Sequence, residues 1–338
     1  MGREQFTCAG LFAGIGGFCF GFEKAGFVTK WVNDFDQHVT SVYKHNFPKT
    51  RVITENVCDL KVKRHALDPV DVLHAGFPCQ SFSIAGNRKG FDDERGRLFF
   101  QITRLIEEFG DSQPKVVVLE NTPNLQTGGL GEWLDIIVRE LQKSGYWVDR
   151  ENCMLGDTKE HGGLPQNRKR LFIIATSQNH FIDNPFTAIP ATKKNIKMSD
   201  LLNIQKRQED NYYLDATNKY GEMLTKHLKG KKPYTLAQLR RYEVRDIAYN
   251  QCPTLTANMG MGGHNVPFLK DRYGLRKLTE AECLLLQGFS NDFAWPIDIG
   301  VTRRYKMIGN AVSPAVSFPI ADAIVSELKP MAKMEMVA

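Results

Sequence analysis

The stretch Phe6-Thr-Cys-Ala-Gly-Leu-Phe-Ala-Gly-Ile-Gly-Gly-Phe18 decides the fold, because an apolar run passes directly into a glycine-rich turn. Outward from it, the chain as far as residue 119 repeats one unit: a short apolar run, a turn and a segment of helical period. This repeat predicts a doubly wound, mostly parallel α/β sheet. Strands are expected at residues 6–12, 28–33, 52–53, 70–75 and 115–119, and an amphipathic helix at 98–109.

Length and composition set the class of protein. The 338 residues correspond to roughly two domains, and 42% hydrophobic with 24% charged residues excludes a disordered or fibrous chain. Lys+Arg 44 minus Asp+Glu 38 gives +6, which permits nucleic acid as a partner but is also ordinary for a soluble surface. The seven cysteines form no CxxC pair and no HExxH occurs, so we expect no disulfide framework, no metal and a reducing, cytoplasmic location. Residues 1–10 contain no long apolar core behind a basic segment, and we expect no membrane span.

The periodicity also predicts the domain boundaries. Residues 1–176 are expected to form the first domain, with a helix at 130–143 that ends at Gly145 and later strands at 146–148 and 171–175. Residues 177–276 have little clean periodicity and carry a basic stretch at 226–245, which favours a second, smaller domain. Residues 277–338 return to helical period, and we expect them to pack on the first domain.

Acidic residues follow the first strands of the predicted sheet. Asp34 ends the second strand about 20 residues after the glycine turn, where a carboxylate can accept hydrogen bonds from a ribose. Phe35 could stack on an adenine, and Asp59 could accept from an exocyclic amine. The turn lacks the GxGxxG dinucleotide fingerprint, which favours a nucleoside without phosphates. Each acid taken alone is more often a loop cap or a solvated residue.

Reactive and charged residues follow the later strands. Cys79 comes straight off the fourth strand within Gly76-Phe-Pro-Cys-Gln-Ser-Phe-Ser83, and Glu120 ends the fifth, so the two are expected to lie together as nucleophile and general acid or hydrogen-bonding partner. A lone cysteine after a strand is more often structural. Arg168 and Arg170 lie two residues apart and share one side of a strand, which is also typical of a solvated basic strand end.

Six ordered motifs resemble those of the DNA (cytosine-5) methyltransferases. They cover nearly the whole chain outside its variable middle and are Phe12-Ala-Gly-Ile-Gly-Gly-Phe18, Gly76-Phe-Pro-Cys-Gln80, Glu120-Asn121, Gln166-Asn-Arg-Lys-Arg170, Gln287-Gly288-Phe289 and Gly309-Asn-Ala-Val312. Two positions depart from the family pattern: Asp34 replaces the usual glutamate, and Thr122 replaces the common valine. The short chain resembles the compact prokaryotic enzymes of restriction-modification systems, with the S-adenosylmethionine-dependent methyltransferase fold.

The resemblance implies a catalytic set and a cofactor shell. It assigns Cys79 to attack on C6 of cytosine, Glu120 to N3 and the exocyclic amine, Arg170 to O2 and Arg168 to ordering of the catalytic loop. The implied cofactor is S-adenosyl-L-methionine, with S-adenosyl-L-homocysteine as product. Its expected contacts are Phe12, Gly14, Gly16, Asp34, Phe35, Asp59, Leu60, Pro78, Leu98, Asn310, Ala311 and Val312.

The implied substrate is double-stranded DNA, from which the target cytosine must be flipped because a duplex hides C6. Residues 81–97 carry glycines and basic residues, as a mobile flap over the flipped base would. Residues 253–267, here called the recognition segment, resemble the threonine-leucine element of the target-recognition domain, although a glycine-rich loop can also be a tight turn. DNA contacts are expected from Gln80, Ser83, Arg88, Arg97, Thr254, Thr256 and Asn258, with phosphate contacts from the basic residues of 226–232 and from Arg240, Arg241 and Arg245.

Three other functions remain open at this point. One is a methyltransferase of the same fold that acts on tRNA, whose motif typically has a proline where Phe77 stands. The second is a catalytically silent DNA-binding relative, and the third is a nicotinamide oxidoreductase. We expect a monomer, with any cognate restriction endonuclease acting separately. The recognition sequence cannot be read from the chain, since each base contact contributes only about 1 to 3 kcal/mol.

Overall fold

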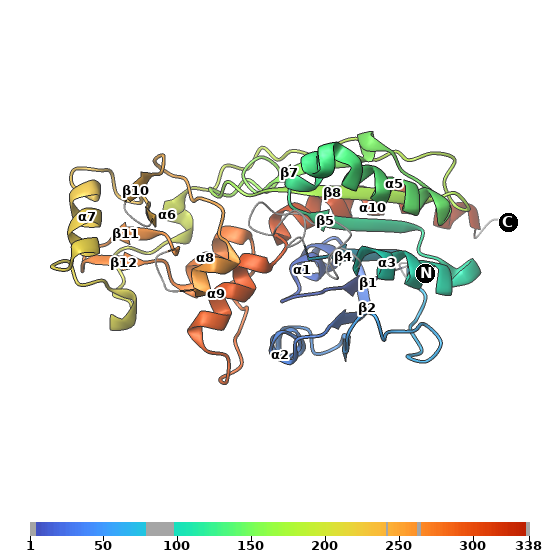
Figure 1. The fold of residues 1–338 in the computed structure, drawn as a ribbon, viewed down its shortest axis with the longest axis horizontal. Coiled ribbons are helices and arrows are strands. Elements are labelled where there is room, and N and C mark those ends of the chain that lie inside the picture. The colour runs from blue at the N-terminus through green and yellow to red at the C-terminus, as the bar shows by residue number, and fades with distance from the viewer. Residues whose placement is uncertain (1–4, 79–97, 241–242, 262–264, 336–338) are drawn as a thin grey trace. The chain divides into compact units, whose positions relative to one another are not determined.

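The computed structural model describes residues 5–78, 98–240, 243–261 and 265–335 (Figure 1). It forms two compact units. Unit 1 comprises Met1–Gly156, Lys169–Ala191 and Val316–Ala338, and unit 2 comprises Asp157–Arg168 and Thr192–Ala315. This division differs from the boundaries expected at 176 and 276. Residues 157–168 belong to unit 2, where backbone hydrogen bonds join them to Cys252. Asn167 N donates to Cys252 O, and Cys252 N donates to Pro165 O.

Unit 1 contains an eight-stranded sheet of order β3-β2-β1-β4-β5-β8-β6, with β7 paired to β8. Neighbours among the first five strands are parallel, whereas β8 is antiparallel to β5 and β6 is antiparallel to β8. The strands are β1 Thr7–Leu11, β2 Val28–Asp34, β3 Arg51–Thr54, β4 Val72–Gly76, β5 Val116–Asn121, β6 Tyr146–Trp147, β7 Cys153–Asp157 and β8 Lys169–Ser177. The helices are α1 Gly17–Lys24, α2 Gln37–Asn46, α3 Leu98–Glu108, α4 Asn124–Thr127, α5 Glu132–Lys143 and α10 Pro314–Glu335.

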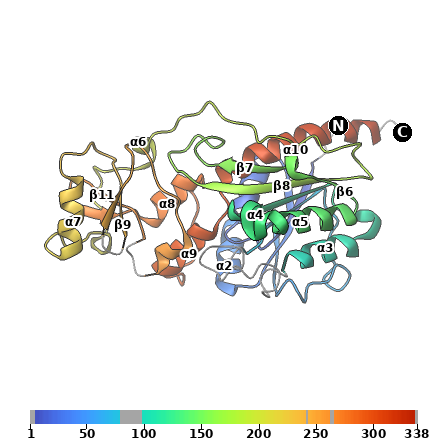
Figure 2. The same cartoon turned by 45° about the horizontal axis from the view of Figure 1, so that its top comes forward.

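Helices cover both faces of this sheet. Leu73 and Ala75 of β4 join the core cluster that contains the buried residues of α3 and α5. His74 lies between them on the other face, where its ring stacks on Phe18 of α1 with centroids 4.7 Å apart. Ser317 of α10 donates to the Gly17 carbonyl at 2.9 Å, which places α10 on the α1 face. Figure 2 shows α10 on one side of β8 and α3 with α5 on the other. The expected doubly wound sheet is therefore confirmed.

Local signals explain where individual elements begin and end. The Asp36 side chain caps α2 by accepting from the backbone N–H groups of His38 and Val39. Helix α5 ends before Gly145, whose φ of 87° gives the left-handed conformation expected there. The helix predicted from residue 130 starts only at Glu132, because residues 129–131 all have positive φ.

Unit 2 contains a four-stranded sheet of order β10-β9-β11-β12. Its strands are short and antiparallel: β9 Ala237–Arg240, β10 Glu243–Asp246, β11 Phe268–Lys270 and β12 Leu275–Lys277. Leu224 and Leu228 pack on this sheet. The fully buried Arg276 forms ion pairs with Asp271 and Glu282 at 2.8 and 2.7 Å. The helices are α6 Met198–Leu201, α7 Lys219–Leu228, α8 Glu280–Gln287 and α9 Val301–Asn310.

One helical stretch is long and apolar enough to cross a membrane. It runs over Val301–Ala332 in the part of the chain that the structure describes, although the sequence analysis expected no such stretch. It consists of α9 and α10, which are separate helices, and 67% of its apolar window is buried within the protein. Burial of this kind is typical of core helices, so the apolar character serves packing.

Candidate active site

The carboxyl ends of β1, β2, β4 and β5 share one edge of the sheet in unit 1. The chain runs from β1 outward to β2 and β3, then crosses back to β4 and outward to β5, so the direction of winding reverses between β1 and β4. Open α/β sheets bind ligands at the carboxyl edge beside such a switch point. The expected Gly14, Asp34, Pro78 and Glu120 all follow or end strands at this edge.

The glycine-rich turn after β1 is held against the end of β2. Ala13 N donates to the Asn33 carbonyl and Gly14 N to Asp34 Oδ2, both at 3.0 Å. Gly14 has a φ of 57°, and a Cβ placed on it would meet nothing within 4 Å. Gly16 differs, because its Cβ would lie 2.3 Å from Phe47 Cε2. Gly14 therefore leaves open space over the turn, whereas Gly16 permits close packing.

Asp34 is the acid at the centre of this turn. Burial raises the pKa of its carboxyl, although backbone N–H groups of Asp36 and Gly14 hydrogen-bond to it and lower the pKa in part. Each carboxylate oxygen accepts one of these donors and keeps a second lone pair. The adjacent Phe35 is 71% exposed. An acceptor beside an exposed aromatic ring and an open glycine turn fits the ribose and base of a nucleoside.

The other expected cofactor residues have varied surroundings. Asp59 is exposed in the turn after β3, whereas Leu60 is fully buried in the core and its carbonyl accepts from Arg104. Pro78 and Leu98 are half-buried, at the exit of β4 and at the first residue of α3. Asn310, Ala311 and Val312 belong to unit 2, where Asn310 is exposed and the other two are buried.

Glu120 and Arg170 form an ion pair at the same edge of the sheet. Arg170 Nε lies 3.2 Å from Glu120 Oε1, and both side chains are mostly buried. The register explains the contact: Glu120 is opposite Phe172 on the antiparallel β8, so Arg170, two residues away, is its diagonal neighbour on the same face. Arg170 also donates through Nη1 to the Lys169 carbonyl. The pair therefore presents a carboxylate and a multidentate cation together.

Asn121, which the sequence analysis did not assign to the site, fixes the exit of β4. Its side chain is buried, and Nδ2 donates to the Phe77 carbonyl at 3.2 Å. This bond ties the end of β5 to the peptide two residues before Cys79. The expected Cys79, Gln80, Ser83, Arg88 and Arg97 lie outside the described residues. A buried asparagine at the end of an apolar strand was the signal that could have indicated this role.

Arg168 is buried in unit 2, where it binds backbone carbonyls. Nη1 donates to Leu255 O at 2.6 Å, and Nη2 donates to Gly309 O at 3.0 Å and Ala311 O at 2.7 Å. The guanidinium thus joins the recognition segment to the end of α9. Gln166 adds to this connection, because its Nε2 donates to Leu286 O and its Oε1 accepts from Leu255 N.

The recognition segment packs against Gly309 and Asn167, and two of its residues are exposed. A Cβ on Gly309 would lie 2.1 Å from the Thr256 carbonyl carbon, so only glycine allows this approach. Thr254 donates its hydroxyl to Asn167 O at 2.6 Å. Thr256 and Asn258 are exposed. Of the three DNA contacts expected here, Thr254 is thus bound into the framework, while Thr256 and Asn258 are presented on the surface.

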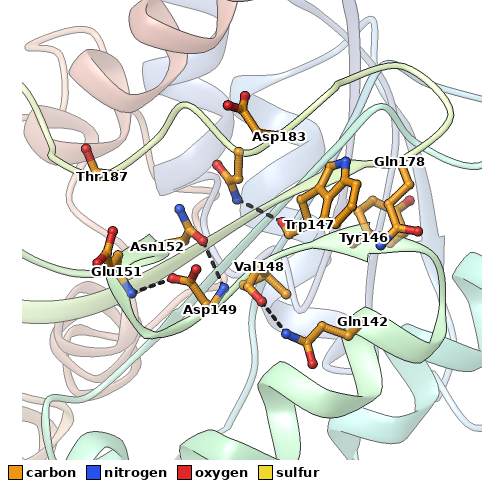
Figure 3. Close-up of a pocket in the computed structure, with 11 residues that line it drawn as sticks. Gln142, Tyr146, Trp147, Val148, Asp149, Glu151, Asn152, Gln178, Asp183 and Thr187 are labelled. Atoms are coloured by element: carbon orange, nitrogen blue, oxygen red, sulfur yellow. Dashed lines mark hydrogen bonds between the residues drawn. The ribbon is translucent and has the colours of Figure 1, made fainter.

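A cavity of about 490 Å³ lies beside β6 and contains none of the expected site residues (Figure 3). Its polar side chains bind neighbouring backbone: Gln142 Nε2 donates to Val148 O, and Asn184 Nδ2 donates to Trp147 O. Asn152 likewise accepts from Asp149 N. These contacts fix the edge of the sheet, and we assign no ligand to this cavity.

Comparison with known proteins identifies the family. The sequence matches the C-5 cytosine-specific DNA methylases over residues 6–326. The chain belongs to this family. The methylase is an enzyme, a DNA (cytosine-5) methyltransferase, as the ordered motifs led us to expect. The edge that carries Asp34 and the Glu120–Arg170 pair is accordingly the candidate active site of a methylase.

Individual relatives support the assignment of the methylase. The Type II methyltransferase M.Bsp6I of Bacillus sp. (strain RFL6) is 38% identical over 319 residues, 94% of this chain and 97% of the relative. The Type II methyltransferase M.NgoBI of Neisseria gonorrhoeae is 33% identical over 307 residues, 90% and 89% of the two chains. Among solved structures, the Entamoeba histolytica methyltransferase EhMeth superposes with a TM-score of 0.73 at 19% identity, over 96% of this chain and 99% of that one. The S. pombe Dnmt2 methyltransferase gives 0.71 at 18% identity, over 96% and 99%. At such identities these two structures show the fold alone.

Proposed function

We propose that this methylase flips a cytosine out of duplex DNA and methylates its C5 within one short sequence. The observation that carries the proposal is the Glu120–Arg170 ion pair, which lies at the carboxyl edge of β5 next to the strand that leads into Cys79. A cytosine ring needs an acid group at N3 and a donor at O2 to become electrophilic at C6. Glu120 and Arg170 offer both groups on one face of the sheet.

The proposed reaction begins with the thiolate of Cys79, which bonds to C6 of the flipped cytosine and turns C5 into a nucleophile. Glu120 engages N3 and the exocyclic amine, and Arg170 engages O2, so both stabilise the charge that the addition places on the ring. After methylation, loss of the proton at C5 and cleavage of the bond between sulfur and C6 restore the aromatic base and free Cys79.

S-adenosylmethionine fits the residues of the glycine-rich turn. The open space over Gly14, the partly buried carboxylate of Asp34 and the exposed ring of Phe35 suit a nucleoside. Asp34 would hold the ribose and Phe35 the adenine, with the remaining expected residues as the shell. When bound, the cofactor supplies an electrophilic methyl group and leaves as S-adenosylhomocysteine. Arg168 is proposed as a positioning residue, because it binds backbone carbonyls.

Double-stranded DNA is the proposed substrate. Residues 81–97 would close over the flipped base, with Gln80, Ser83, Arg88 and Arg97 as contacts. Thr256 and Asn258, which are exposed on the recognition segment, would face the groove, and Thr254 would support them. The relatives M.Bsp6I and M.NgoBI carry the name Type II methyltransferase. We infer the same restriction-modification role in the cytoplasm for this enzyme, acting as a monomer that protects host DNA from a separate endonuclease.

The test is methylation of DNA by the purified protein. We would incubate it with S-adenosylmethionine labelled in the methyl group and unmethylated genomic DNA, and then map 5-methylcytosine by bisulfite sequencing. Methylation at one short sequence is the expected result. Cys79→Ser should abolish transfer but retain DNA and cofactor binding, with Cys58→Ser, an exposed cysteine of unit 1, as matched control. Label in RNA alone, or turnover by Cys79→Ser, would contradict the proposal.

A further inference from the structure

A second cavity, of about 280 Å³, lies at one end of the small sheet in unit 2. Phe268 of β11 pairs with Ala237 of the antiparallel β9, so Lys270 runs alongside Thr235, just before β9 begins. Segments far apart in the sequence therefore meet here. We call this the cationic cavity, and it is lined by Ile204, Gln205, Leu228, Lys231, Lys232, Pro233, Tyr234, Thr235, Lys270, Asp271 and Arg272.

The charge of the lining is positive. Of the described side chains that line the cavity, Asp271 alone is acidic. Its carboxylate forms an ion pair with the buried Arg276 and accepts a hydrogen bond from the Tyr213 hydroxyl. Lys231 is also compensated, because Asp246 forms an ion pair with it. Lys232, Lys270 and Arg272 remain as three cations on the lining, from two segments about 40 residues apart.

Tyr234 gives the cavity a strained aromatic wall. Its φ of 65° is in the left-handed region, which a bulky residue rarely adopts. A turn holds it there, since Thr235 N donates to Lys232 O at 3.2 Å. A second aromatic ring is close by, because Lys232 Nζ lies 5.2 Å from the ring centroid of Tyr249. Strain of this kind persists where a site over-determines the backbone, which is common at ligand clamps.

We propose that the cationic cavity binds a backbone phosphate of the DNA substrate, outside the sequence that the enzyme reads. This inference rests on the proposed function. Lys232, Lys270 and Arg272 form no ion pair with a described carboxylate, so these three cations match a phosphodiester. A phosphate contact fixes register without reading bases. The recognition segment ends at residue 267, directly before β11, whose three residues span about 10 Å. DNA carries one charge per roughly 1.7 Å of its axis, so flanking phosphates are available at that distance.

Among the residues that line this cavity, the sequence predicts phosphate contacts only from those within 226–232. The structure adds Lys270 and Arg272, which belong to the end of β11 and the loop after it. Because these cations come from a different segment, charge along the chain alone could not group them with Lys232. The grouping places exposed cations from two segments around one cavity.

The test compares two doubly substituted proteins. Lys232→Ala with Arg272→Ala removes two cavity cations, and Lys193→Ala with Lys219→Ala removes two exposed lysines of unit 2 that do not line the cavity. Affinity is measured for a duplex with long flanks and for one trimmed to the recognition sequence. We expect the cavity variant to bind the flanked duplex about tenfold more weakly, as for a lost charge-assisted hydrogen bond, and to reduce the salt slope of log Kd by roughly 1 per phosphate.

The trimmed duplex and the matched variant provide the contrast. Both proteins should keep wild-type affinity for the trimmed duplex, and Lys232→Arg with Arg272→Lys should restore binding to the flanked one. Equal losses in both double variants, or wild-type affinity in the cavity variant, would overturn the proposal. So would inorganic phosphate that binds the cavity but is not displaced by flanked DNA, since the anion would then be a free one. Wild-type methylation of DNA is measured in parallel, so a failure of the proposed function is seen separately.

Discussion

Arg170 Nε lies 3.2 Å from Glu120 Oε1, across the antiparallel junction of β5 and β8. The strand register creates this contact, because residues diagonal to each other in an antiparallel pair share a face. The carboxylate and the guanidinium hold each other in place before any substrate arrives. A preorganised pair of this kind loses little conformational freedom when charge develops on a bound base.

Glu120→Gln should slow methyl transfer strongly. The amide cannot act as an acid or carry the charge of a carboxylate, so we expect the rate to fall by roughly 10²- to 10⁴-fold. Cofactor affinity, measured by calorimetry, should stay near that of the wild type. Glu132→Gln, at an exposed position in the first turn of α5, is the matched control and should leave the rate unchanged. Equal losses of rate and cofactor affinity would make Glu120 a structural residue.

Gly14→Ala should weaken cofactor binding by filling the open space over the turn. Because Gly14 has a φ of 57°, alanine also strains the backbone, at a cost of roughly 1 kcal/mol. Gly26→Ala separates the two effects, since Gly26 also has positive φ and open space but lies at the end of α1. Both variants should lose similar stability in urea unfolding, and only Gly14→Ala should lose affinity for S-adenosylmethionine. Wild-type affinity in Gly14→Ala would remove the turn from the cofactor site.

The parallel half of the sheet was predictable from sequence for a physical reason. Strands β4 and β5 are buried on both faces, so β5 begins with the apolar run Val116–Leu119 and β4 is apolar apart from the buried His74. Turns and segments of helical period separate these runs. The direction of β8 was not predictable, because an apolar run has the same pattern whether the strand runs parallel or antiparallel. Its antiparallel pairing is nevertheless what brings Arg170 to Glu120.

Secondary structure and burial were harder to predict from sequence in unit 2 than in unit 1. Its strands have three or four residues each, too short for a period of two to emerge, and Arg276 is a fully buried cation that composition alone would place on the surface. The residues that connect segments also escaped prediction. Asn121 and Gln166 act through bonds to backbone groups far along the chain, at 44 and 120 residues, which no local pattern reveals.

Arg168→Met should destabilise the protein by roughly 3 kcal/mol, because it removes the donor to three buried carbonyl oxygens, those of Leu255, Gly309 and Ala311. Urea unfolding measures the loss. Lys169→Met, at the exposed neighbouring position, is the control and should change stability little. If Arg168 positions the recognition segment, Arg168→Lys should also relax sequence discrimination more than it reduces the rate at the preferred site. An Arg168→Met protein as stable as the wild type would contradict the framework role.

His74 should make the protein less stable in mild acid. Burial lowers its pKa from 6.5 to about 3, so between these values the unfolded chain binds a proton that the folded chain does not. The free energy of unfolding therefore falls as pH decreases below 6.5, by up to about 1.4 kcal/mol per pH unit from this group. His74→Leu should flatten that dependence in urea unfolding over a series of pH values, whereas His45→Leu, at an exposed position, should retain it. Identical slopes for the wild type and His74→Leu would show that His74 does not remain neutral in the folded protein.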